Sequence, residues 1–262
     1  MGKKDFGVIL RRLGNKAKLA DKIIPLFPPH KTYIEPFFGA GAIFFAKERS
    51  RYNFLNDLDG DVFNLWKVVD ENKESLIEYI ETMPNCERVL EYWNKADLPT
   101  EPIKKAARFL MLSNYTFLGK GGTLAFGATH SKEVLLKNIK KIMRFENCNF
   151  LNCDFRDVLK KICFAPDQID KTKTFIYLDP PYLSSTDNYS YSFTESDSAD
   201  LFKTAVDSRI PFAMSEFNQP FILEQAAHYN LNIHILGERR NMKNRRTEIL
   251  ITNYQLNQPT LF

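Results

Sequence analysis

The segment Asp179-Pro180-Pro181-Tyr182 combines a carboxylate, two prolines and an aromatic ring directly after the apolar run 174–178. Ligands of open α/β sheets bind where the strands end, which is where this segment falls. The Asp179 carboxylate and the Pro180 carbonyl can hold the two N–H groups of an aromatic amine, which favours the pyramidal nitrogen that attacks a sulfonium methyl. Tyr182 offers a stacking face for a base that has left its duplex, as adenine N6 requires. This chemistry needs no metal.

A glycine turn far upstream could hold a cofactor. Gly39 and Gly41 lie between an expected strand and an expected helix, where glycine lets the backbone approach a ligand closely. A dinucleotide fingerprint would need a third small residue where Phe44 stands, so a nicotinamide cofactor is disfavoured. Asp57, which ends the next strand, can accept hydrogen bonds from both hydroxyls of a ribose. The alternative is that Asp57 caps the following helix.

Alternating periodicities predict the elements that position these residues. Strands are expected at 32–35, 52–55, 149–151, 174–178, 210–214, 231–236 and 249–252. Helices are expected at 42–49, 155–162, 197–208 and 220–229, with a capping box at Thr194 and Asp197. Residues 61–145 are almost wholly helical in pattern, apart from a glycine-rich loop at 119–127. The fold class is α/β, with a Rossmann-like mixed sheet, an antiparallel pair at one edge and an inserted, mainly helical lobe.

Composition excludes several classes of protein. The 262 residues are 44% hydrophobic and 26% charged, no long apolar stretch is present, and the N-terminus does not resemble a secretory signal. We therefore expect a cytoplasmic protein with no membrane partner. The spacing of the four cysteines matches no zinc pattern. A net charge of +4 permits a polyanionic partner, and the basic residues gather at 137–144 and 238–246.

In the order and spacing of these motifs, the sequence resembles the Dam-type adenine methyltransferases, over most of the chain. The resemblance implies transfer of a methyl group from S-adenosylmethionine to adenine N6 in double-stranded DNA, with S-adenosylhomocysteine as product and no metal. It implies catalytic roles for Asp179, Pro180, Pro181 and Tyr182. It implies that the cofactor is held by Arg12, Lys16, Glu35, Pro36, Phe37, Gly39, Ala40, Gly41, Asp57, Asp154, Phe155 and Asp179.

The resemblance also divides the chain by function. Residues 1–60 and 146–262 would form the catalytic domain, and residues 61–145 a lobe that recognises the DNA target, in a protein expected to be monomeric in solution. The recognition hairpin departs from members that act on GATC, so the target sequence is not carried over. Candidate DNA contacts are Asn114, Tyr115, Lys120, Tyr189, Arg239, Arg240, Lys243, Arg245 and Arg246.

Three other functions remain open on the sequence. The acceptor could be an amino group in RNA or cytosine N4, which share the same chemistry. The chain could be a silent relative that only binds nucleic acid, although Asp179 and Tyr182 would then have no use. A methyltransferase acting on a small molecule would not need the basic run 239–246.

Overall fold

The computed structural model describes residues 9–10, 16–84, 87–95, 97–116, 128–143, 145–165, 169–183, 193–240 and 245–256. They form two compact units. Unit 1 comprises the described parts of 1–18, 39–48 and 59–146, and unit 2 those of 19–38, 49–58 and 147–262. The predicted catalytic domain included 1–18 and 39–48, which here group with the helices of unit 1. The functional division into two domains stays a prediction.

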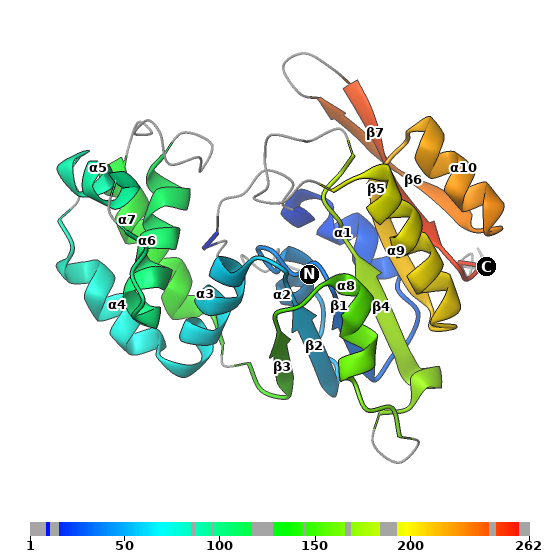
Figure 1. Cartoon of the computed structure of the whole chain (residues 1–262), viewed down its shortest axis with the longest axis horizontal. Helices are drawn as coiled ribbons and strands as arrows, with labels where there is room; N and C mark the ends of the chain where they lie inside the picture. The colour runs from blue at the N-terminus through cyan, green and yellow to red at the C-terminus, as the bar shows by residue number, and fades with distance from the viewer. Residues whose placement is uncertain are drawn as a thin grey trace, which may run out of the picture. The chain divides into compact units, whose positions relative to one another are not determined.

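Unit 2 is built on a seven-stranded mixed sheet (Figure 1). The strands are β1 (Thr32–Glu35), β2 (Tyr52–Asn56), β3 (Cys148–Leu151), β4 (Thr174–Leu178), β5 (Phe212–Phe217), β6 (Asn232–Arg240) and β7 (Arg245–Thr252). Their order is β3-β2-β1-β4-β5-β7-β6, and β7 runs antiparallel to both of its neighbours. This arrangement confirms the predicted α/β fold class and its antiparallel edge.

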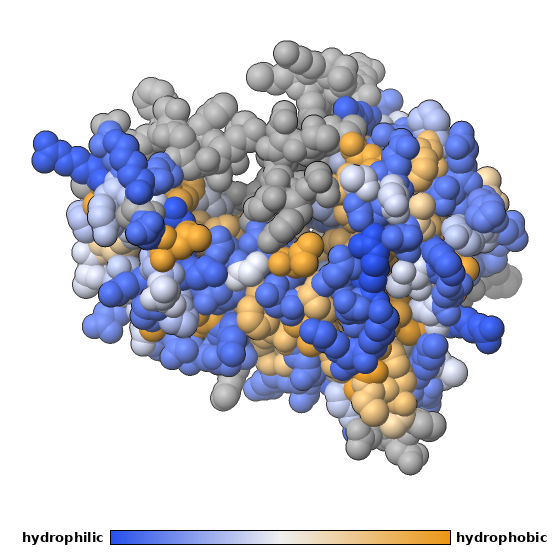
Figure 2. Space-filling view, in the orientation of Figure 1, coloured by the Kyte–Doolittle hydropathy of each residue, from blue (hydrophilic) through white to orange (hydrophobic). Residues whose placement is uncertain are grey.

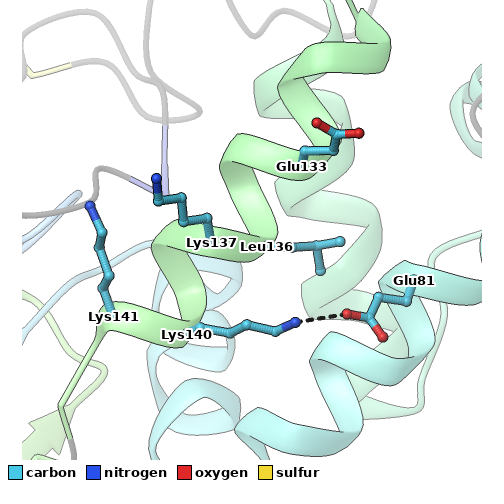
Figure 3. Close-up of a pocket in the computed structure, with 6 residues that line it drawn as sticks. All are labelled: Glu81, Glu133, Leu136, Lys137, Lys140 and Lys141. Carbon is cyan, nitrogen blue, oxygen red and sulfur yellow. Dashed lines mark hydrogen bonds and ion pairs between the residues drawn. The ribbon is translucent and has the colours of Figure 1, made fainter.

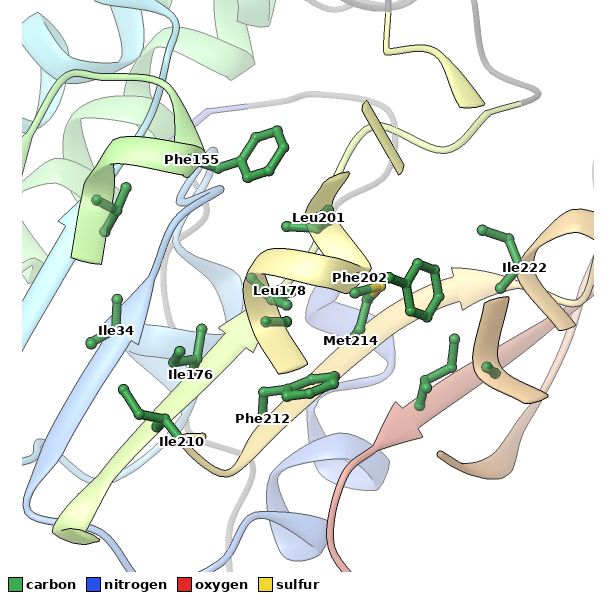
Figure 4. Packing of buried hydrophobic residues seen from close by; sticks show 14 of the residues in the cluster. Ile34, Phe155, Ile176, Leu178, Leu201, Phe202, Ile210, Phe212, Met214 and Ile222 are labelled. Atoms are coloured by element: carbon green, nitrogen blue, oxygen red, sulfur yellow. The ribbon is translucent and has the colours of Figure 1, made fainter. Parts of the chain in front are cut away.

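Three helices cover one face of the sheet: α8 (Phe155–Val158), α9 (Glu195–Asp207) and α10 (Pro220–His228). Figure 4 shows the buried core between them and the sheet, where Leu178 and Met214 of the strands lie close to Leu201 and Phe202 of α9. The capping box predicted for α9 is present, since Thr194 and Asp197 bond reciprocally. Short 3-10 turns follow α8 (Leu159–Lys161) and precede β4 (Lys171–Lys173).

An N-terminal segment covers the opposite face. It contains α1 (Ala20–Ile23) and the 3-10 turn Ile24–Leu26, and it ends in Phe27, whose ring lies 4.6 Å from that of Phe175 and 5.4 Å from that of Tyr177. β1 and β4 are buried along their whole length because both faces are covered. Double burial favours the apolar and aromatic residues within both strands, and the polar residues Thr32, Glu35 and Thr174 lie at strand ends.

Unit 1 is helical, as its periodicity predicts. It contains the 3-10 turn Lys16–Lys18, α2 (Ala42–Ala46), α3 (Gly60–Glu71), α4 (Lys73–Thr82), α5 (Glu87–Lys95), α6 (Pro102–Tyr115) and α7 (Ala128–Lys141). The predicted buried stripe of α6 is observed at Ala106, Ala107, Leu110 and Met111. α2 is shorter than expected, because Lys47 adopts an extended backbone conformation with ψ at 163°. The glycine-rich segment 119–127 lies outside the described residues.

The surface visible in Figure 2 is mostly hydrophilic, with smaller groups of hydrophobic residues between the charged ones. Within the described ranges, no helix combines the length and apolar character that a membrane crossing requires. The same residues contain no group of three or more histidine, cysteine, aspartate or glutamate side chains able to hold a metal ion.

Candidate active site at the carboxyl edge of the sheet

Four loops of unit 2 meet at the carboxyl edge of the parallel strands. Glu35 pairs with Leu55 and Asn56 pairs with Leu151, so β1, β2 and β3 end side by side. β1 also pairs with β4, and the strand order reverses between these two strands. Such a reversal opens a crevice at the strand ends, where ligands of doubly wound sheets bind. The loops after β1, β2, β3 and β4 contain most of the predicted site residues.

The loop after β2 presents the predicted ribose ligand. The Asn152 side chain fixes this loop by donating to the carbonyls of Asp57 (2.7 Å) and Leu58 (3.1 Å). Asp57 is half-buried, and it does not cap α3, because Asp59 is the N-cap and accepts from the Asp61 N–H at 2.9 Å. The capping alternative for Asp57 is therefore wrong. Leu58, which the sequence analysis missed, is 44% exposed beside it.

The loop after β3 carries Asp154 and Phe155. The Asp154 carboxylate caps α8 by accepting from the Arg156 N–H at 2.9 Å, and it also pairs with the Arg156 guanidinium. Phe155 is only 7% exposed, since the rings of Phe37 and Phe193 lie 5.6 Å and 6.1 Å away. The Arg156 guanidinium carbon lies 4.4 Å from the Phe155 ring centroid. The predicted adenine ligands are thus part of a closely packed wall.

Arg156 joins this loop to the start of α9, and the sequence analysis missed it. Its guanidinium donates to Asp197 at 2.7 Å and to Asp200 at 2.8 Å. These carboxylates raise the pKa of Arg156 further above its ordinary value, against the opposing effect of burial. Arg156 therefore holds the first turns of α9 against the loop after β3. Arginine is too frequent on protein surfaces for sequence alone to single it out.

We predict that Asp197→Asn lowers the melting temperature at neutral pH. The hydrogen bonds from Thr194, and then those from Arg156, lower the pKa of Asp197 below its ordinary 3.8. The ionised carboxylate therefore stabilises the fold above that pH, and this contribution is lost as the pH falls through the lowered pKa. Loss of the cap and the ion pair costs about 1 kcal/mol.

Thermal unfolding at a series of pH values checks this prediction. The difference between wild type and Asp197→Asn should shrink as the pH falls below 3.8, the ordinary pKa. Asp207→Asn, at the other end of α9, is the control, because its carboxylate is at a helix C-terminus and its exposed ion pair with Lys203 contributes little to stability. A difference that stays constant with pH would contradict the assigned role of the Asp197 charge.

The loop after β4 is the predicted catalytic motif. Asp179 is half-buried, and Tyr182 is 8% exposed, with its ring edge-on to Phe217 at 4.5 Å. Burial raises the pKa of Tyr182 well above its ordinary value, and the nearby Asp179 charge raises it further. The phenol is therefore neutral at physiological pH. Phe217, at the end of β5, completes an aromatic wall that the sequence analysis did not identify.

Beneath this loop, one face of the sheet carries a polar layer. The Tyr33 hydroxyl donates to the Glu35 carboxylate at 2.8 Å, and the hydroxyls of Tyr177 and Ser215 lie 2.8 Å apart. Burial raises the pKa of Tyr33 and of Tyr177, with further contributions from Glu35 and Asp179. Glu35 is 2% exposed, so its carboxylate is held within the sheet. Its predicted contact with the cofactor stays a prediction.

The glycine turn belongs to unit 1. Gly39 and Gly41 have φ of +49° and +66°, a left-handed conformation that favours glycine. The Trp66 indole donates to the Gly39 carbonyl at 2.8 Å and anchors the turn to α3. Lys16 is 3% exposed. The cofactor contacts predicted for Lys16, Gly39, Ala40 and Gly41 stay predictions, and Arg12 lies outside the described residues.

Of the residues predicted to contact DNA, two are buried and three lie outside the described residues. Asn114 is 5% exposed and its amide donates to the carbonyls of Ile9 and Leu110, at 2.8 Å and 2.9 Å, and Tyr115 is fully buried. Burial gives no support to a DNA contact by either side chain. Lys120, Tyr189 and Lys243 lie outside the described residues.

The basic run near the C-terminus lies on the β6–β7 hairpin. Arg239 is directly opposite Arg246, and Arg240 is opposite Arg245. The Arg246 guanidinium carbon lies 5.3 Å from the centroid of the Phe217 ring, the same ring that contacts Tyr182. Arg246 is therefore near the catalytic motif within unit 2.

The basic cluster at 137–144 includes a lysine that stabilises the packing of α7 on α4. A groove of about 530 Å³ is lined by residues of α4 and α7, and Lys140 pairs with Glu81 there at 2.9 Å. Figure 3 shows this pair and the other lining residues. Lys132 donates to the carbonyls of Glu81 and Met83, at 2.9 Å and 2.6 Å, at the C-terminal end of α4. Both lysines attach α7 to α4, and the ion pair of Lys140 accounts for one member of the 137–144 cluster without a polyanion.

The known proteins that this chain resembles are methyltransferases. The model of the D12 class N6 adenine-specific DNA methyltransferase family matches residues 13–242. The chain is 27% identical over 261 residues to the DNA adenine methylase of Escherichia coli (strain K12), covering 89% of this chain and 88% of that protein. It is 26% identical over 274 residues to the type II methyltransferase M1.LlaDCHI of Lactococcus lactis subsp. cremoris, covering 92% and 93% respectively.

Proposed function

Since the chain belongs to the D12 class of N6 adenine-specific DNA methyltransferases, we propose that it methylates a flipped-out adenine in double-stranded DNA, with S-adenosylmethionine as the methyl donor. One observation carries the proposal: Asp179 and Tyr182 follow β4 at the point where the strand order reverses, beside the end of β1. Asp179 supplies the acceptor and Tyr182 the aromatic wall that the reaction requires at that edge.

The neighbouring loops fit an adenosine. Asp57, fixed by Asn152, accepts from the ribose hydroxyls, and the exposed Leu58 side chain offers an aliphatic surface to the adenine. Asp154 retains oxygen lone pairs for the adenine amino group, since a carboxylate has about four acceptor positions. When bound, S-adenosylmethionine supplies an electrophilic methyl group.

The residues after β4 act on the base. The Asp179 carboxylate and the Pro180 carbonyl accept the two N–H groups of adenine N6, which directs the nitrogen lone pair out of the ring. Tyr182, supported edge-on by Phe217, stacks on the flipped base. The neutral Tyr182 phenol places no second negative charge beside Asp179.

The β6–β7 hairpin binds the DNA backbone. Its opposed pairs Arg239–Arg246 and Arg240–Arg245 place like charges directly across an antiparallel ladder, which destabilises the isolated hairpin. A polyanion removes this repulsion, and phosphate contacts by arginine position a duplex without reading its sequence. Proximity of Arg246 to Phe217 brings this surface close to the base site.

Replacing Arg240 and Arg245 together by glutamine should weaken duplex binding and reduce its dependence on salt. Each lost phosphate contact lowers the slope of log affinity against log salt by about 1, so a reduction of about 2 is expected. Fluorescence anisotropy with a labelled duplex at several salt concentrations measures this slope.

The double variant Lys171→Gln, Lys173→Gln is the matched control, because it removes two charges at the amino edge of the same sheet. It should bind DNA with the salt dependence of the wild type. An unchanged slope for the arginine variant, or an equal decrease in the control, would contradict the proposed role of the hairpin.

The proposed function is tested by equilibrium binding. S-adenosylmethionine and an unmethylated duplex should each bind the wild-type protein, and each should raise its melting temperature. Preference for single-stranded RNA over duplex DNA would replace the proposed acceptor, and DNA binding without cofactor binding would indicate a silent binding protein.

A further inference from the structure

Asn56, the last residue of β2, connects three of the loops that form the site. Its side-chain amide N–H groups donate to the carbonyls of Pro36 (2.9 Å) and Cys153 (3.0 Å). Its side-chain oxygen accepts from the Cys153 backbone N–H at 3.1 Å. Its backbone carbonyl accepts from the Phe38 N–H at 2.8 Å. The loops after β1 and β3 are therefore hydrogen-bonded to Asn56, and the loop after β2 begins at the next residue.

Two of these positions adjoin residues to which the proposed function gives a role, because Asn56 precedes Asp57 and Cys153 precedes Asp154. The third partner, Pro36, is itself one of the predicted cofactor residues. We infer that Asn56 is a positioning residue for the cofactor, which sets the separation of the ribose ligand Asp57 and the adenine ligand Asp154. The inference rests on the proposed function, and Asn56 itself need not touch the cofactor.

Only an amide satisfies all the partners. Asn56 is 1% exposed, so its partners lie in a buried environment where an unmet donor or acceptor is costly. Aspartate has nearly the same shape and still accepts from the Cys153 N–H, but it directs a carboxylate at the carbonyls of Pro36 and Cys153. These two loops should then move apart while the strand itself is retained.

The same strand offers a matched control. Asn53 is fully buried at the amino end of β2, and its amide donates to the Ser50 carbonyl at 2.9 Å and to the Asn147 carbonyl at 3.4 Å. Asn53→Asp therefore repeats the chemistry of Asn56→Asp, three residues away and at the edge of the sheet opposite to the site. A purely structural role predicts the same consequences for both variants.

The experiment compares Asn56→Asp, Asn53→Asp and wild type by isothermal titration with S-adenosylmethionine and by thermal unfolding. Loss of a supporting partner typically costs at least about tenfold in affinity, and we expect that rise in Kd for Asn56→Asp alone. The maximal methyl-transfer rate at saturating cofactor should stay within about threefold of wild type, because the acceptor site is unchanged. Asn53→Asp should lower the melting temperature with an unaltered Kd.

If Asn56→Asp does not fold, Asn56→Ser is used instead, because its hydroxyl leaves room for water and introduces no charge. A Kd within about twofold of wild type in a folded variant overturns the inference, as does an equal rise in Asn53→Asp. A wild-type protein that does not bind S-adenosylmethionine overturns the proposed function, which distinguishes that failure from an error about Asn56.

Discussion

Asp179→Asn should lower the rate of methyl transfer by about 10²–10³-fold while leaving cofactor affinity nearly unchanged. The carboxylate stabilises the positive charge that develops on the attacking nitrogen, and a neutral amide does not. Asparagine can also turn an N–H toward the N–H groups of adenine, which removes an acceptor and adds a repulsive contact. Because its shape matches aspartate, the loop after β4 should retain its conformation.

Single-turnover kinetics at saturating cofactor and duplex isolates this step from binding. Asp170→Asn is the matched control, because Asp170 lies just before β4, at the opposite end of the strand that carries Asp179. The control should react at the wild-type rate. An Asp179→Asn enzyme that folds, binds both substrates and reacts at the wild-type rate would disprove the assigned chemistry.

Asp57→Ala should raise the Kd for S-adenosylmethionine by at least about 100-fold. Two hydrogen bonds from ribose hydroxyls to a carboxylate are lost, and each hydrogen bond to a charged group contributes about 1.5–3 kcal/mol. The transfer rate at saturating cofactor should be close to wild type, because Asp57 lies on the loop after β2 and the reacting groups follow β4.

Titration calorimetry with Asp57→Ala and Asp59→Ala checks this assignment. Asp59 is two residues away and caps α3, so its replacement should cost about 1 kcal/mol of stability without changing cofactor affinity. If Asp59→Ala weakened cofactor binding as much as Asp57→Ala, the ribose contact would not be specific to Asp57.

Sequence periodicity predicted the strands well because local pattern and burial agree there. β4 is hydrophobic after Thr174 and buried along its whole length, and the capping box of α9 involves only residues three apart. The predicted strands also placed the motifs that follow them, because the parallel strands of an α/β sheet end at one common edge.

The supporting residues could not be predicted, because their partners are distant in sequence. Asn56 contacts Cys153 across 97 positions, and Arg156 contacts Asp200 across 44. Only the fold brings these groups together. Burial likewise depends on the fold: the polar and aromatic side chains of Asn114 and Tyr115 suggested contact with DNA, but both are buried in unit 1, which gives that prediction no support.

The most direct test of the account is the transfer of a labelled methyl group from S-adenosylmethionine to unmethylated duplex DNA, followed by digestion and identification of the labelled nucleoside. We predict that the label appears in N6-methyladenine and that Asp179→Asn abolishes most of it. Label in N4-methylcytosine, or in RNA and not in DNA, would contradict the proposed acceptor. No transfer to any nucleic acid by a protein that binds the cofactor would contradict the proposed reaction.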